Sequence, residues 1–310
     1  MLKRHFREFS VLGVLLSVLA LLGVFAPDFF APQPLLSRLT AAAPKLVVAC
    51  GIAMVIISRQ IDISVGSLFA VCSVVCGLVA AAKMPLPLAI ASAVAAGAIG
   101  GGLNGALVAC LRLPSIVVTL ATMVAFREGL RLGQQGVFID LPDGLQWVGL
   151  PMTGGQYLVC GIALTVLAAM AAVMRHLAIG RAVYAVGSDA EAARLAGIRP
   201  RLVTFGVFVL MGALTGLAAV MNVIQSPQVD PNTGRMLELE AIAAAVVGGV
   251  AVSGGRGNLG GVLVGFLLLA CITPALTYIG VKPYWDKAIQ GAVILLAVVA
   301  DGLRNRKNGR

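Results

Sequence analysis

The chain has little charge and few of the side chains that carry out chemistry in enzymes. Of its 310 residues, 12% are Asp, Glu, Lys or Arg, and the two histidines are His5 and His176. Each histidine lies beside basic residues, and the sequence has no Ser/His/Asp set, no pair of acids at catalytic spacing and no metal-binding cluster. These absences argue against both an enzyme and a metal site.

Nucleotide-binding motifs are also missing. No lysine follows a glycine, which excludes a P-loop. Gly255, Gly257 and Gly260 have the G-x-G-x-x-G spacing of dinucleotide sites, but apolar segments flank them. Tyr278 or Ile279 stands where the acid that binds a ribose belongs. We therefore expect no cofactor on this chain.

The six cysteines show no pairing or metal-binding pattern. All lie within apolar runs and lack C-x-x-C spacing, so we expect them to pack as small hydrophobic residues without disulfides. They are Cys50, Cys72, Cys76, Cys110, Cys160 and Cys271.

Long apolar runs make up most of the sequence. Hydrophobic residues account for 59% of the chain and the mean hydropathy is +0.99, which a water-soluble domain cannot accommodate. Apolar runs of about 17 to 25 residues can cross a bilayer as helices. We expect an all-α polytopic membrane protein with one transmembrane domain over residues 1–310. The ten expected spans lie near residues 9–26, 40–58, 66–83, 86–111, 115–133, 156–174, 202–224, 238–252, 258–279 and 285–302.

The basic residues predict how the chain is oriented. Residues 134–155 contain no Lys or Arg, whereas residues 175–201 contain five Arg. Because cytoplasmic loops carry an excess of Lys and Arg, we expect the first loop in the periplasm and the second in the cytoplasm. The N-terminal residues 1–8 and the basic tail 303–310 are then also cytoplasmic. This orientation accounts for the net charge of +10 without a nucleic acid partner.

The stretch from Arg175 to Arg201 is polar, yet its residues predict a folded element. Ser188 and Glu191 have the S-x-x-E spacing of a capping box, so a helix is expected to begin at about Asp189. Gly197 is expected to end it. Roughly eight residues span only ~12 Å, far less than a bilayer.

Two apolar segments carry a glycine at every fourth position. Such stripes let helices approach closely in lipid, and the alternative is a sliding or gating seam. The glycines are Gly97, Gly101 and Gly105 in one segment and Gly257, Gly261 and Gly265 in the other.

Polar residues inside the apolar segments are few. Asp62 and Ser64 lie where the second span ends, and they either cap and hinge the next helix or contact a substrate. Asn104 lies among glycines and is expected to bond to a neighbouring helix.

Charged residues are expected at the outer ends of two spans. Glu238 begins the eighth span, where an acid complements the helix dipole. Arg127 and Arg131 share one helix face, and they either extend to the outer headgroups or line an entry vestibule.

Five stretches together resemble the permease subunits of bacterial monosaccharide ABC importers of the ribose and rhamnose class, with rhamnose-type permeases the most similar. The family usually has two glycines where this chain has Arg59 and Gln60. The stretches are VIISRQIDISVGS (55–67), GGLNGALVACLRLPSIVVTLATM (101–123), residues 180–198 with the core YAVGSDAEAARLAGI (184–198), ELEAIAAAVVGGVAVSGGRGNLGG (238–261) and YWDKAIQGAVILLAV (284–298).

The resemblance implies a coupling role for the loop at 175–201, which would dock onto an ATPase subunit. Gly187 and Gly197 would supply turns, and Ala192 and Ala193 a flat face for the partner. The residues carried over are Gly180, Arg181, Tyr184, Gly187, Ser188, Asp189, Glu191, Ala192, Ala193, Arg194, Gly197 and Ile198.

The resemblance also implies the rest of the assembly. The expected partners are an ABC ATPase carrying ATP and Mg²⁺, a second permease copy or homologue, and a periplasmic sugar-binding protein, all at the bacterial inner membrane.

The expected path or gate residues are Asp62, Ser64, Asn104, Thr119 and Glu238.

Two other interpretations stay open at this point. An ion-coupled secondary transporter needs ionisable residues near the middle of the membrane, whereas we expect the acids of this chain at span ends. Within the ABC class, the solute is either a sugar such as rhamnose or a sugar-like furanose signalling molecule. The sequence distinguishes neither the solute nor a homodimer from a heterodimer of permeases.

Overall fold

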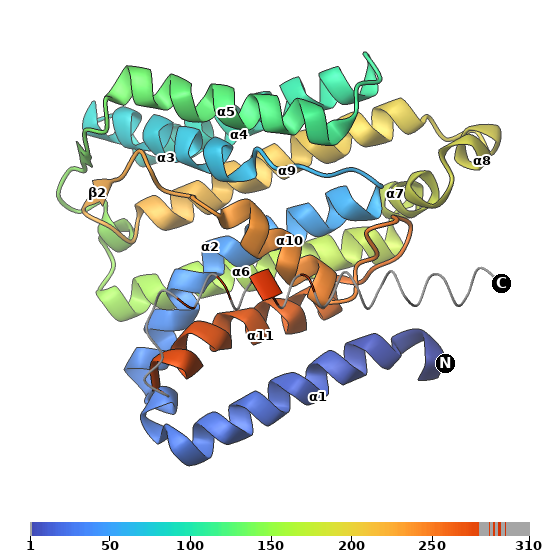
Figure 1. The fold of residues 1–310 in the computed structure, drawn as a ribbon. Helices are drawn as coiled ribbons and strands as arrows, with labels where there is room; N and C mark the ends of the chain where they lie inside the picture. The colour runs from blue at the N-terminus through green and yellow to red at the C-terminus, as the bar shows by residue number, and fades with distance from the viewer. Residues whose placement is uncertain (1, 279–284, 286–287, 289–290, 293–294, 296–310) are drawn as a thin grey trace.

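The structure is a bundle of helices that run along one common direction (Figure 1). This computed structural model describes residues 2–278 and the isolated residues 285, 288, 291, 292 and 295. The expected tail at 303–310 lies outside the described residues, and so does nearly all of the expected span at 285–302.

Nine of the ten expected spans coincide with helices in the described part of the chain. Only two strands occur there, each two residues long, so the protein is all-α. The long helices are α1 (Leu2–Phe25), α2 (Pro32–Ile57), α3 (Val65–Ala81), α4 (Leu86–Ala109), α5 (Ser115–Gln134), α6 (Met152–His176), α9 (Pro200–Val223), α10 (Leu237–Val247) and α11 (Leu259–Tyr278). The short elements are η1 (Pro27–Phe30), β1 (Ile139–Asp140), η2 (Gln146–Gly149), α7 (Ala178–Ser188), α8 (Ala190–Leu195) and β2 (Gln228–Val229).

Five of the described helices are long and apolar enough to cross a membrane. They are α2, α4, α6, α9 and residues 259–276 of α11, and two shorter apolar helices cover 10–25 and 65–81. The eighth expected span differs most, because α10 has 11 residues where 238–252 was expected. At 1.5 Å per residue it is ~16 Å long, about half of a bilayer core.

Helix α2 forms the centre of the bundle. Every residue from Leu46 to Ser58 is buried, and α2 packs against α6, α9 and α10. An apolar helix buried on all sides contacts protein rather than lipid, so α2 organises the other helices around it.

Glycines bring α4 and α9 into contact backbone to backbone. A Cβ on Gly97 or Gly101 would overlap the carbonyl oxygen of Gly212 or Phe208, and one on Gly216 would overlap that of Ala93. Such contacts explain the stripe, since any side chain there would push the two helices apart.

The second glycine stripe lies only partly on a helix. Gly261 and Gly265 of α11 pack against Gly248 at the end of α10. Gly257 instead precedes α11 in the connecting segment, with a φ of 155°, so the expectation of three glycines on one helix was wrong.

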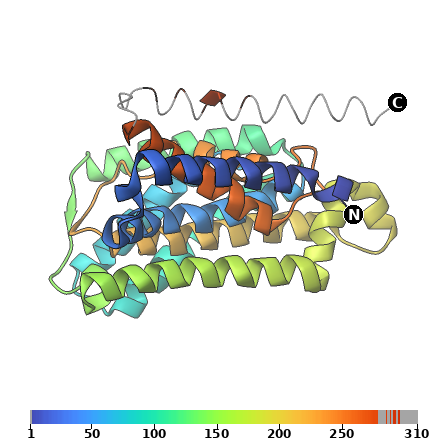
Figure 2. The same ribbon diagram turned by 90° about the horizontal axis from the view of Figure 1, so that it is seen from below.

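The two ends of the bundle differ in structure. At one end β1 pairs antiparallel with β2, and Ile139 lies opposite Val229. At the other end lie α7, α8 and the start of α1, as both ribbon views show (Figures 1 and 2). The segment at 134–155 and the segment at 175–201 therefore occupy opposite ends, as their charges predict.

We predict that Gly212→Ala lowers the melting temperature of the detergent-solubilised protein by several degrees. Overpacking a helix contact costs about 1–3 kcal/mol. Gly206→Ala on the same helix has no atom within 4 Å of the added Cβ and serves as the control. Equal melting temperatures for the two variants would contradict the close α4–α9 contact.

We predict that a cysteine introduced at Gly144 reacts with a membrane-impermeant maleimide in intact spheroplasts. This residue lies between β1 and η2, at the end of the bundle opposite α8. Labelling that requires permeabilised membranes would overturn the proposed orientation.

Candidate functional site

The segment at 175–201 contains two helices rather than one. Helix α7 runs to Ser188 and α8 begins at Ala190. Asp189 separates them, with extended φ and ψ of −155° and 107°. The sequence therefore placed the start of the short helix correctly but missed the helix before it.

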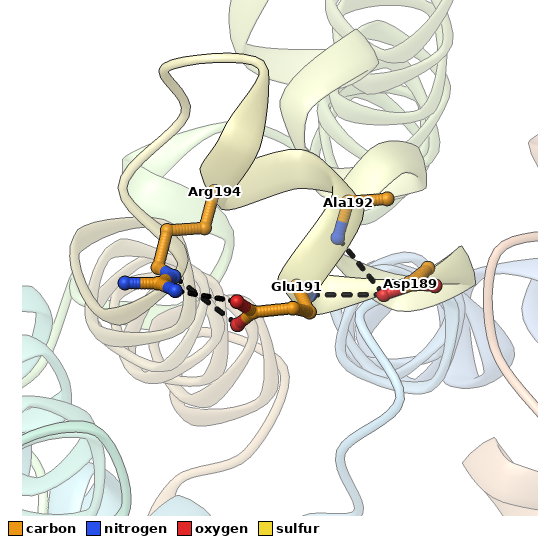
Figure 3. Close-up of polar contacts among 4 residues, drawn as sticks. All are labelled: Asp189, Glu191, Ala192 and Arg194. Carbon is orange, nitrogen blue, oxygen red and sulfur yellow. Dashed lines mark hydrogen bonds and ion pairs between the residues drawn. The ribbon is translucent and has the colours of Figure 1, made fainter.

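The cap of α8 is Asp189, not Ser188 (Figure 3). Its Oδ1 accepts hydrogen bonds from the backbone N–H groups of Glu191 at 2.9 Å and Ala192 at 3.0 Å. Ser188 cannot serve, because it is the last helical residue of α7 and an N-cap has a non-helical backbone. The sequence therefore placed the cap one residue too early, and Ser188 and Glu191 form no capping box.

Glu191 pairs with Arg194 instead of reaching back to the cap. Nε of Arg194 donates to Oε2 of Glu191 at 3.1 Å, and Nη2 of Arg194 donates to Oε1. The hydrogen bond from Arg194 lowers the pKa of Glu191, and the same bond raises the pKa of Arg194. Both side chains remain about two-thirds exposed, so the pair is available to a partner.

The far end of α8 closes with a Schellman motif. Gly197 has a φ of 83°, its N–H bonds to the carbonyl of Arg194 at 3.0 Å, and the N–H of Ile198 bonds to that of Ala193 at 3.0 Å. The six-residue helix is thus satisfied at both ends without any partner.

Two expectations for this segment are corrected by burial. Ala193 is 4% exposed and packs into the protein, so only Ala192 faces outward. Gly187 lies within α7 and makes no turn, because a Cβ there would overlap the carbonyl oxygen of Ile57. Gly180 is also buried, against the backbone of Met174.

Helix α7 is tied to the ends of two other helices. Tyr184 Oη donates to the carbonyl of Gly257 at 2.9 Å, and the N–H of Gly255 donates to the carbonyl of Ile57 at 2.8 Å. Arg59 lies beside Gly254 with a left-handed φ of 64°, a conformation that glycine adopts more readily than arginine. The end of α2 and the segment before α11 therefore meet on α7.

Polar side chains converge where the chain re-enters the bundle after α2. Ser64 Oγ donates to Asp62 Oδ1 at 2.7 Å and accepts from Asn104 Nδ2 at 2.8 Å. Thr119 Oγ1 lies 3.4 Å from the carbonyl oxygen of Ile61. The backbone N–H of Ile61 donates to Ser115 Oγ at 3.2 Å. Four of the five expected path residues thus lie together. Ser115, which was not expected from the sequence, follows Pro114 in the same motif as Thr119.

Two acceptors in this polar cluster have no partner. Asp62 is 1% exposed and Asn104 is fully buried, yet Asp62 Oδ2 and Asn104 Oδ1 accept no hydrogen bond in the structure. Asp62 therefore lies inside the bundle, which corrects the expectation that the acids lie at span ends.

Glu238 also lies beside the start of α3. Its carboxylate lies against Gly66, and Gly66 and Gly234 each leave no room for a Cβ on the other. Arg127 Nη1 donates to the carbonyl of Thr233 at 3.1 Å, and the guanidinium group interacts electrostatically with Glu238. Glu238 is thus half-buried at the first turns of both α10 and α3, rather than at the outer surface.

A cavity of about 530 Å³ opens beside Arg127. Arg127 and Arg131 line it, as the vestibule interpretation expects. Its other lining residues are Glu128, Gln135, Gly136, Pro231, Asn232 and Arg235.

Among the side chains that the structure describes, no three His, Cys, Asp or Glu gather in a way that could hold a metal ion. Gly255 and Gly257 lie between α10 and α11, and Gly260 is in the first turn of α11. No strand precedes these glycines in that segment, so they do not form a dinucleotide site.

The structure has helices that can span a bilayer, a buried polar cluster between α2 and α3, and a short capped helix at one end of the bundle. These features together are typical of a membrane transport subunit. Residues 35–298 match the family model described as "Branched-chain amino acid transport system / permease component". The chain belongs to this family: it is the permease subunit of an ABC importer of the ribose and rhamnose class, located in the inner membrane, and it is not an enzyme.

Curated relatives match over nearly the whole chain. The autoinducer 2 import system permease protein LsrC of Salmonella typhi is 33% identical over 96% of this chain and 86% of its own. The LsrC proteins of Yersinia enterocolitica and Escherichia coli O157:H7 are 33% and 32% identical, with 82% and 87% of their lengths covered. No solved structure matches the chain.

We predict that Asp189→Ala speeds amide hydrogen exchange in residues 190–196 about fivefold. Loss of an N-cap costs ~1 kcal/mol, which corresponds to this factor. Ser188→Ala is the matched control and is expected to leave exchange unchanged. The opposite order of effects would restore Ser188 as the cap.

Proposed function

We propose that this chain forms the path for a small furanose-like solute of the autoinducer 2 kind. The support is that the LsrC relatives, alike over 96% of this chain, are autoinducer 2 import permeases. They favour the furanose alternative over rhamnose, which none of these relatives is named for.

The proposed assembly has four kinds of component. Two permeases, the second a copy or a homologue, enclose the path in the bilayer, and an ATPase that binds ATP and Mg²⁺ docks at the end of the bundle that carries α8. A periplasmic binding protein delivers the solute at the end that carries β1 and β2.

The coupling role is supported by the contacts of α7 with the end of α2 and with the segment before α11. Tyr184 and Gly187 contact the segment before α11 and the end of α2. The segment before α11 follows α10 in the chain, and the end of α2 leads into α3. The first turn of α3 in turn touches Gly234, just before α10, at Gly66. A displacement of α8 by an ATPase would therefore reach the polar cluster at Asp62 through packed backbone.

A second candidate is an ion-coupled transporter, which the buried carboxyl group of Asp62 favours. It predicts uptake that stops when a protonophore collapses the membrane potential while ATP is maintained. Family membership argues for the ATP-driven mechanism, which predicts uptake that persists under these conditions.

The solute is tested by uptake in a bacterial strain that lacks this chain but keeps its partner subunits. We expect the chain to restore removal of autoinducer 2 from the medium, measured against D-ribose and L-rhamnose. Restored uptake of rhamnose or ribose alone would overturn the furanose assignment, and restored uptake of none would overturn import of this class.

We predict that Glu191→Arg lowers solute uptake by roughly tenfold or more while the chain stays in the membrane and ATP hydrolysis continues. Reversing a charge at a docking surface sets it against the charge of the partner that it previously attracted. The double exchange Glu191→Arg with Arg194→Glu rebuilds the pair within α8. Full uptake in this double variant would show that the two charges act only on each other, which contradicts docking through them.

A further inference from the structure

Two helices of the bundle begin inside it, and their first turns meet. Helix α3 starts at Val65 and α10 at Leu237, and the backbones of Gly66 and Gly234 touch. The two helices leave this junction toward opposite ends of the bundle (Figure 1). Both positive helix ends therefore point at one place.

The junction offers hydrogen-bond donors. The first intrahelical bond of α3 runs from Leu68 N–H to the carbonyl of Ser64, so the earlier N–H groups of the first turn have no partner within the helix. Neither N-cap residue, Ser64 or Met236, accepts a bond from its own helix through its side chain.

Acceptors also lie beside the start of α3, on Asp62 before it and on Asn104 of α4. Asp62 Oδ2 and Asn104 Oδ1 are buried and without hydrogen bonds, and Ser64 Oγ links the two side chains at 2.7 and 2.8 Å. A buried polar atom without a partner is costly, so this pair is suited to an occupant that donates hydrogen bonds.

We propose that the α3–α10 junction is the point on the path that binds the solute, and that it selects a neutral polyhydroxylated molecule. Each hydroxyl group both donates and accepts, which matches backbone N–H groups beside carboxyl and amide oxygens. An anion would meet Asp62 and Glu238, and a cation would face two positive helix ends. This inference rests on the import role proposed above and adds the chemistry of the recognised groups.

Glu238 closes the junction in this conformation. Its carboxylate lies against Gly66, where the first turn of α3 stabilises negative charge. The carboxylate thereby occupies the helix end that a solute oxygen would take, and the solute displaces it when the two helices separate.

Asp62→Asn tests the solute contact in the full importer. It keeps the size of the side chain but replaces one acceptor oxygen by an N–H₂ donor. The probe is whichever of autoinducer 2, D-ribose and L-rhamnose the wild-type chain imports, together with its analogues that each lack one hydroxyl group.

We expect Asp62→Asn to raise the KM for the parent solute roughly tenfold, as loss of a hydrogen bond to a charged group does. For the analogue without the contacting hydroxyl group the KM should change less than about twofold, because that bond is already missing. An equal change for the parent and every analogue would assign Asp62 a structural role and overturn the proposal. If Asp62→Asn does not accumulate in the membrane, Asn104→Asp is used with the same series and the same criteria.

Glu238→Gln tests the closure. It is expected to raise the ATP-independent efflux of the preloaded solute from membrane vesicles about threefold, which is the scale of the interaction between one charge and a helix end. Glu240→Gln, two residues along α10, removes a charge that pairs with Lys45 at 2.8 Å and is the matched control. Equal efflux from the two variants would overturn the closing role of Glu238. A wild-type chain that restores no uptake would instead refute the import function itself.

Discussion

Every N–H and C=O group in the hydrocarbon of a bilayer needs a partner within the protein, and this chain interrupts helices inside the bundle. The segment from Ser58 to Ser64 has no regular structure, and side chains of α5 bond to its backbone at Ile61. Ser64 and Asn104 connect the same segment to α4. Several of the buried polar residues therefore bond to the backbone or side chains of the segment that lacks helical bonds, and the start of α3 depends on them.

Contact between backbones is the second recurring device. It joins α4 to α9 at Gly97 and Gly212, α7 to α2 at Gly187, and α3 to the turn before α10 at Gly66. Because backbone atoms cannot rotate away as side chains do, each contact fixes the distance between two segments. A movement applied at α7 would therefore be transmitted to the starts of α3 and α10 rather than absorbed by side-chain rotation.

The sequence predicts where most of the helices lie, but it does not predict where they begin and end inside the bundle. Helices occur at nine of the ten expected spans in the described part of the chain, and five of them are long and apolar enough to cross a membrane. The same criteria gave α10 too many residues and missed α7, whose mixed polar and apolar residues resemble a loop. The cap moved from Ser188 to Asp189 because α7 extends one residue further than a local motif can reveal.

The candidate site was predicted in its residues but not in its geometry. Asp62, Ser64, Asn104 and Thr119 were singled out as rare polar groups, and the fold brings them together across three helices. Glu238 was expected at the outer surface, because no local pattern shows that the chain descends into the bundle before α10. Its contact with Gly66 joins residues far apart in the sequence, which only the tertiary structure supplies.

The shortness of α10 also constrains how the protein enters the membrane during synthesis. The neighbouring α9 and residues 259–276 of α11 have mean hydropathies of 2.1 and 2.3 and can be inserted as independent spans. An 11-residue helix with two acids in its first turn has too little apolar length to be inserted alone. We therefore expect α10 to reach its place only with the help of its neighbours, so that the junction with α3 forms after α11 has been made.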